Sequence, residues 1–94
     1  MGHEEIEAIR IDDLEELVKS SEETLEEIKR DFNTESCRHE AMDRSFMIGE
    51  TVEDYLVNHP YIMFRPECYK LAFQAQELLA ELYQTVGRSD FNQE

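Results

Sequence analysis

Apolar residues recur at steps of three and four along the first third of the chain, with glutamate, lysine and arginine filling the positions between them. The members of this stripe are Ile11, Leu14, Val18, Leu25, Ile28 and Phe32. Such a pattern is typical of a helix that buries one side. It predicts one helix over about residues 11–32 and a frayed segment over residues 1–10. Residues 20–23 have the composition of a helix start, but no glycine or proline precedes them, so the sequence favours a single helix.

Two further helices follow, each bounded by residues that start or stop helices. Residues 33–36 gather good N-cap residues and predict a turn into a helix over about 36–57. That helix is expected to end before Pro60, because proline disfavours the helical conformation of the residue preceding it. Pro66 is suited to the first turn of a third helix over about 66–86. Gly87 is then expected to stop this helix in a left-handed conformation.

Three amphipathic helices of similar length, joined by short connections, predict an all-α protein with the up-down-up topology of a three-helix bundle. We expect one helical domain over residues 1–94, with residues 88–94 flexible and the bundle completed by homodimerisation. The alternative is a long helical hairpin, in which the first two helices form one continuous rod. On the second helix, the core-facing side is expected to centre on Ile48 and to include Ala41, Val52, Tyr55 and Leu56. On the third helix, Leu71 and Leu78 flank an expected core stripe of Cys68, Ala72, Ala75, Leu79, Leu82 and Val86.

Several apolar residues fall outside these core stripes, and they are the candidate partner-binding site. They are Met42, Phe46, Tyr61, Ile62, Met63, Phe64 and Phe73. A patch of this size on a surface is typical of a protein–protein contact. A kink near Gly49 would instead turn Met42 and Phe46 into the core, and the loop aromatics would then cap the end of the bundle. The leading hypothesis is a non-enzymatic interaction or regulatory module that forms a homodimer through this second apolar surface and then engages another protein.

The charge of the chain suggests a different class of function as the alternative. The formal net charge is −14, and the first 36 residues hold thirteen carboxylates against four basic side chains. Such a chain repels nucleic acid and anionic lipid, so we expect it to bind neither directly. Carboxylates one helical turn apart have a spacing similar to that of phosphates, so an acidic face could occupy the nucleic-acid site of a basic DNA- or RNA-binding protein. The residues of this face are Asp12, Glu16, Glu23 and Glu27.

Metal, cofactor and catalytic sites are not expected. Cys37 and His39 are two residues apart, hence on different sides of the predicted helix, and His59 and Cys68 lie about 30 Å away at its far end. A four-ligand zinc site is therefore excluded, as is a disulfide between the two cysteines. His39 with Glu35 and Asp43 gives a third functional hypothesis, a weak metal-binding protein. No phosphate-binding glycine loop or supported nucleophile is present, so no cofactor and no enzymatic activity are expected.

The sequence also suggests where the chain resides. Its longest uncharged apolar run is residues 61–64, far below the roughly 20 residues of a membrane span. Glu4, Glu5 and Glu7 stand where a signal peptide would carry lysine or arginine. We therefore expect a cytoplasmic protein that does not contact membranes.

Overall fold

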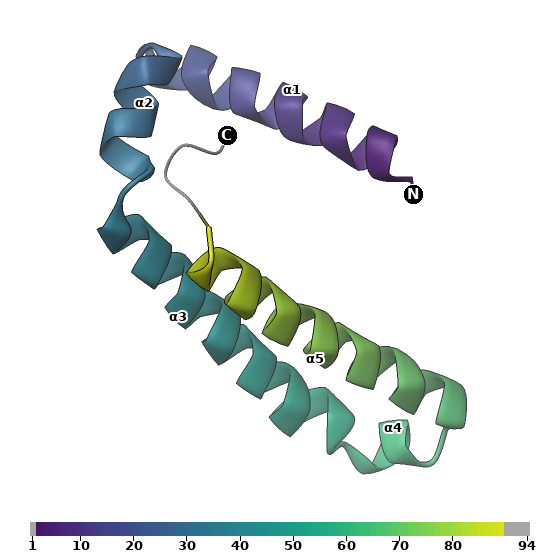
Figure 1. Cartoon of the computed structure of the whole chain (residues 1–94). Helices are drawn as coiled ribbons and strands as arrows, with labels where there is room; N and C mark the ends of the chain where they lie inside the picture. The colour runs from purple at the N-terminus through teal and green to yellow at the C-terminus, as the bar shows by residue number, and fades with distance from the viewer. Residues whose placement is uncertain (1, 90–94) are drawn as a thin grey trace. The chain divides into compact units, whose positions relative to one another are not determined.

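The structure is a computed structural model that describes residues 2–89, and all regular structure in this part of the chain is helical. The all-α prediction is thereby confirmed. The chain divides into two compact units, one up to Thr34 and the other from Glu35 onward. Figure 1 shows the elements. They are α1 (His3–Ser21), α2 (Leu25–Phe32), α3 (Glu35–Val52), a π-helical turn η1 (Glu53–Val57), α4 (Pro60–Met63) and α5 (Pro66–Gly87).

The first unit contains two helices where the sequence predicted one, so the continuous helix over residues 11–32 is wrong. Glu22 follows α1 in the left-handed conformation, with φ of 60°. Thr24 then caps α2: its hydroxyl accepts from the Glu27 N–H at 3.2 Å, and the Glu27 carboxylate accepts from the Thr24 N–H at 3.2 Å. This reciprocal pair satisfies two amide groups that a helix start leaves open. The capping box therefore starts a helix without any preceding glycine or proline.

The ends of the first unit also differ from the predicted ranges. α1 begins at His3, so the residues expected to fray belong to a helix. Residues 33 and 34 are not helical and separate α2 from α3, which excludes the continuous rod of the long-hairpin alternative. Of the tail predicted to be flexible, residues 90–94 lie outside the described part of the chain. The single domain and the packing of a three-helix bundle stay predictions.

The second unit is an antiparallel helical hairpin, with α3 and η1 as one arm and α5 as the other (Figure 1). These arms match the predicted helices over 36–57 and 66–86 closely. Small side chains let the arms approach each other, because Ser45 and Gly49 face α5. A Cβ placed on Gly49 would lie 3.7 Å from the Cβ of Leu79, an ordinary contact distance. The Ser45 hydroxyl is buried and donates to the Ala41 carbonyl at 2.8 Å, so it leaves no polar group unsatisfied.

Gly87 does not have the role that the sequence suggested. No glycine among residues 2–89 has a positive φ, and Gly87 is the last residue of α5, with Arg88 as its C-cap. Gly87 matters instead because it has no Cβ. A Cβ at Gly87 would lie 3.1 Å from the Cε of Met42, which is tighter than most van der Waals contacts. Gly87 therefore permits Met42 to pack across the open end of the hairpin.

The π-helical turn decides which side chain anchors the closed end of the hairpin. A π-helix places more residues in each turn than an α-helix, so each residue turns through a smaller angle around the axis. Side chains beyond its start therefore point in a different direction than they would in a continuous α-helix. In a continuous α-helix, Leu56 would point at α5 and Val57 would point to one side. With η1 in place, Val57 is buried at 4% exposure and Leu56 remains 46% exposed. The predicted kink near Gly49 is replaced by this turn four residues later.

The break at Glu22 generates the first testable prediction. In the left-handed conformation glycine has no Cβ strain, so Glu22→Gly should raise the free energy of unfolding by up to about 1 kcal/mol. A continuous helix over residues 11–32 would lose about 1 kcal/mol from the same substitution. Urea unfolding followed by circular dichroism distinguishes the two signs. Glu15→Gly, inside α1, is the matched control and should destabilise the chain in either case.

Candidate interaction surfaces on the helical hairpin

One side of the hairpin is a broad apolar surface, which we call the leucine face. It is composed of Ile48, Leu56, Leu71, Leu78 and Leu82, whose exposed fractions are 52%, 46%, 67%, 65% and 47%. Their positions at 100° per residue place all five on the same side of the plane through the two antiparallel helices. Val52 and Ala75 fill the space between them along the arms. A continuous apolar strip this long is more than isolated surface leucines provide on an ordinary monomer.

The leucine face carries no carboxylate over most of its length. Between residues 41 and 56 on the first arm, Arg44 is the only charged position that points to this side, and between 68 and 86 on α5 every position that points to it is uncharged. This is unusual in a chain in which one residue in three is charged. The sequence placed Ile48, Leu56 and Leu82 on the core stripes of a bundle, with Leu71 and Leu78 flanking the stripe of the third helix. The signal in the sequence is the width of the apolar arc on α5. Leu71 and Leu78 flank the Leu79 stripe, so they cannot face α3 when Leu79 does.

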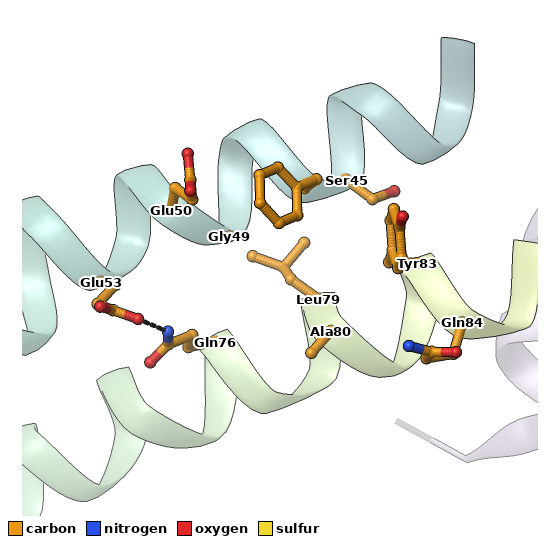
Figure 2. A pocket seen from close by; sticks show the side chains of 10 residues that line it. Ser45, Gly49, Glu50, Glu53, Gln76, Leu79, Ala80, Tyr83 and Gln84 are labelled. Carbon is orange, nitrogen blue, oxygen red and sulfur yellow. Dashed lines mark hydrogen bonds between the residues drawn. The ribbon is translucent and has the colours of Figure 1, made fainter. Parts of the chain in front are cut away.

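The opposite side of the hairpin carries a pocket of about 360 Å³ between the two arms, which we call the acidic groove (Figure 2). Its floor is apolar and is formed by Phe46, Gly49, Leu79, Ala80 and Tyr83. The rings of Phe46 and Tyr83 lie 5.9 Å apart between centroids at an angle of 52°, a favourable tilted arrangement. Figure 2 shows Leu79 between the two helices, directed toward Gly49.

Two carboxylates line the α3 side of the acidic groove. Glu53 accepts a hydrogen bond from the side-chain amide of Gln76, which links the two arms across one end of the groove (Figure 2). Glu50 stands one turn away on the same edge and is exposed. No lysine, arginine or histidine lines the groove in the part of the chain that the structure describes. The groove therefore combines an apolar floor with uncompensated negative charge.

The structure distributes the predicted apolar site residues over three places. Met42 is half-buried and packs against Gly87, so it belongs to the contact between the arms. Phe46 lines the acidic groove and is 53% exposed. Phe73 lies on the same side of the hairpin, beside Tyr69, with a ring separation of 6.2 Å. Their part in partner binding stays a prediction.

The remaining four residues of that site lie at the closed end of the hairpin, in and after the short helix α4. His59 caps α4, because its Nδ1 accepts from the Tyr61 N–H at 3.1 Å. The guanidinium of Arg65 lies 3.6 Å from the centre of the Tyr61 ring, a cation–π contact. Tyr61, Met63 and Phe64 are exposed, whereas Ile62 is half-buried. The loop aromatics therefore do not fill the end of the hairpin.

The four residues of the predicted acidic face do not share one helix. Asp12 and Glu16 are exposed on α1. Glu23 lies in the break between α1 and α2, and the Glu27 carboxylate is held by Thr24 in the capping box. The regular spacing on which phosphate imitation depends is interrupted at the left-handed Glu22, and Glu27 already has an intrachain partner.

Cysteine and histidine residues are placed apart from one another. Cys37 and Cys68 form no disulfide, and they lie in the first turns of α3 and α5, hence at opposite ends of the hairpin. His39 Nε2 lies 3.1 Å from a Glu35 oxygen on the exposed side of α3. Among residues 2–89, no three His, Cys, Asp or Glu side chains lie close enough together to hold one metal ion. The weak metal-binding hypothesis has no further support from the geometry.

Comparison with protein-family models, curated proteins and solved structures finds no match to this chain. Within the described residues, none of the helices has the length and apolar character needed to cross a bilayer. The leucine face and the acidic groove are therefore the features of the chain that bear on its function.

Glu35, at the start of α3, gives a prediction for pH dependence. A hydrogen bond from Arg38 is the main cause that lowers the pKa of Glu35, and nearby His39 adds to it. Because the charged form is favoured in the folded chain, this pair contributes stability at neutral pH and loses it as the pH falls through the lowered pKa. In Arg38→Gln, the pKa of Glu35 should rise toward its ordinary value in a carboxyl NMR titration. Arg44→Gln, which removes the partner of Glu40, should leave the pKa of Glu35 in place.

Proposed function

We propose that the chain is a non-enzymatic interaction module that self-associates through the leucine face. The observation that carries this proposal is the exposure of Ile48, Leu56, Leu71, Leu78 and Leu82 on one side of the hairpin, where no carboxylate stands among them. Two hairpins placed face to face form a four-helix bundle, in which each apolar side chain is covered by the other copy. The sequence suggested a dimer surface centred on Phe46 and the loop aromatics. The dimer surface proposed from the structure lies instead on the other side of the same hairpin.

Electrostatics supports a second copy as the partner on this side. Two chains of net charge −14 repel each other, so they associate only where carboxylates can stay away from the contact. The leucine face meets this condition. A two-fold interface also uses the same patch on both chains, so a self-complementary apolar strip is sufficient and no second surface has to match it.

The size of the leucine face indicates the affinity. Covering the exposed half of a leucine or isoleucine side chain is worth about 1 kcal/mol, so five residues on each of two copies supply about 10 kcal/mol. Association itself costs about 4–15 kcal/mol. At the lower end of that cost about 6 kcal/mol remains, so we expect a reversible dimer with a dissociation constant of tens of micromolar. Its mass should therefore depend on protein concentration between about 1 and 100 µM.

Light scattering coupled to size exclusion tests the leucine face with Leu78→Glu. The substitution should raise the dissociation constant of the dimer by about 100-fold or more, because each copy loses apolar burial and must desolvate a carboxylate. Leu71→Glu should behave alike. Gln84→Glu adds the same charge to α5 on the side of the acidic groove, away from the leucine face, and should leave the dimer intact.

Two results would contradict the proposal. One is a chain that stays monomeric at 100 µM, and the other is a dimer that survives both leucine substitutions. Circular dichroism of each variant verifies that the helices persist. This control is informative because Leu71 and Leu78 are both about two-thirds exposed, so a charged side chain at either position has access to water within the chain.

A further inference from the structure

The acidic groove lies on the side of the hairpin opposite the leucine face, so it stays open when two copies pair through that face. Its volume of about 360 Å³ falls within the range of sites that accept a ligand group. A second copy of the chain is a poor occupant, because Glu50 and Glu53 would then face another strongly acidic protein. The groove therefore requires a partner of different chemistry.

We propose that the acidic groove binds a basic amphipathic segment of a partner protein, with one apolar side chain entering beside Leu79 and lysine or arginine pairing with Glu50 and Glu53. The apolar floor of Phe46, Leu79 and Ala80 selects the entering side chain. The two carboxylates select the charge of its neighbours. Neither feature alone defines the partner, but together they describe a helix with an apolar stripe and a basic edge.

The spacing of the two carboxylates fits a helical partner. Glu50 and Glu53 are three residues apart on one helix, which places their Cβ atoms about 5–6 Å apart. Cationic side chains at the same interval on a partner helix have matching spacing. Binding of this kind, in which an amphipathic helix lies in a groove between two helices, is a recurrent mode of peptide recognition. The net charge of −14 adds long-range attraction for such a segment and accelerates its approach.

Glu53 is partly held in place before any partner arrives. Its carboxylate accepts from Gln76 on the other arm, so its position is defined by both helices (Figure 2). Glu50 has no hydrogen bond or ion pair within the described residues, and its charge is available to a partner. A positioned carboxylate beside a free one loses less side-chain entropy on binding than two free ones.

Fluorescence anisotropy with synthetic peptides tests the proposal on the full-length chain. The probe is a labelled 14-residue peptide with leucine at helical spacing and lysine at the flanking positions. We expect micromolar binding in low salt that weakens as salt is added. Two matched peptides provide the comparison, one with glutamate in place of lysine and one with serine in place of leucine. Both should bind at least about tenfold more weakly.

Variants separate the groove from the general acidity of the chain. Glu50→Gln combined with Glu53→Gln should weaken binding of the basic peptide by at least about tenfold. The matched control combines Glu77→Gln with Glu81→Gln, which removes the same charge from positions of α5 outside the groove. This control should change binding by less than about threefold. Ala80→Phe keeps every charge and fills the groove, so it should also abolish binding.

The proposal is overturned if the two double variants weaken binding equally, since the peptide would then respond to net charge alone. It is also overturned if the serine peptide binds as well as the leucine peptide, or if Ala80→Phe has no effect. The mass of the chain is a separate measurement. Groove variants should leave the dimer unchanged, and leucine-face variants should leave peptide binding unchanged, so each proposal can fail without the other.

Discussion

Two helices that run side by side can bury only the narrow stripe along which they touch, and the rest of this hairpin follows from that limit. Within it, Ser45 and Val57 are the only described residues that are buried, and each still keeps a few per cent of its surface exposed. A helix whose apolar arc is wider than one contact stripe must leave the excess exposed unless another element covers it. Both arms of the hairpin have such wide arcs. The protein therefore presents apolar surface on two sides, separated by the plane of the helices.

The two sides differ in charge, and this difference gives each a separate chemistry. Burying a carboxylate against an apolar partner is costly, so a side that includes Glu50 and Glu53 is unsuited to a purely apolar contact. The side with Ile48 and the leucines of α5 has no such cost. One side of the hairpin is thus suited to contact with another apolar surface, and the other side is suited to contact with a positively charged partner.

Helical content and most helix limits could be predicted from the sequence because they depend on local chemistry. Pro60 and Pro66 restrict the backbone wherever they occur, and the spacing of apolar residues sets the amphipathic arcs. The break at Glu22 was also encoded locally, in the Thr24–Glu27 pair, but only residues 20–23 were considered as a helix start, and the apolar stripe favoured one helix across them. A capping box is sufficient to start a helix even where nothing visibly stops the previous one.

The details that the sequence could not supply depend on contacts between distant residues. The sequence around Gly87 suggested a left-handed helix stop, yet Gly87 stays helical, and its missing Cβ leaves room for Met42, which is 45 positions earlier in the chain. In the same way, the choice of Ile48 as the centre of the core face assumed a helix of constant pitch. The packed face instead passes through Ser45 and Gly49, because small residues permit the closest approach of the arms. Ile48 and Leu56 therefore lie to one side of the packed face, although the sequence had assigned them to the core.

The π-helical turn between Glu53 and Val57 has a consequence for how the chain can vary in length. It holds one residue more than an α-helical path of the same height would need, and it follows the segment that packs against Leu79 and Tyr83. Deletion of one residue at this turn would convert it to a regular α-helical path. The loop that carries Tyr61 and Phe64 would then leave the helix in a different direction. The residues of α3 that face α5 would stay the same. The loop at the closed end of the hairpin can thus vary in sequence and length independently of the packed arms α3 and α5.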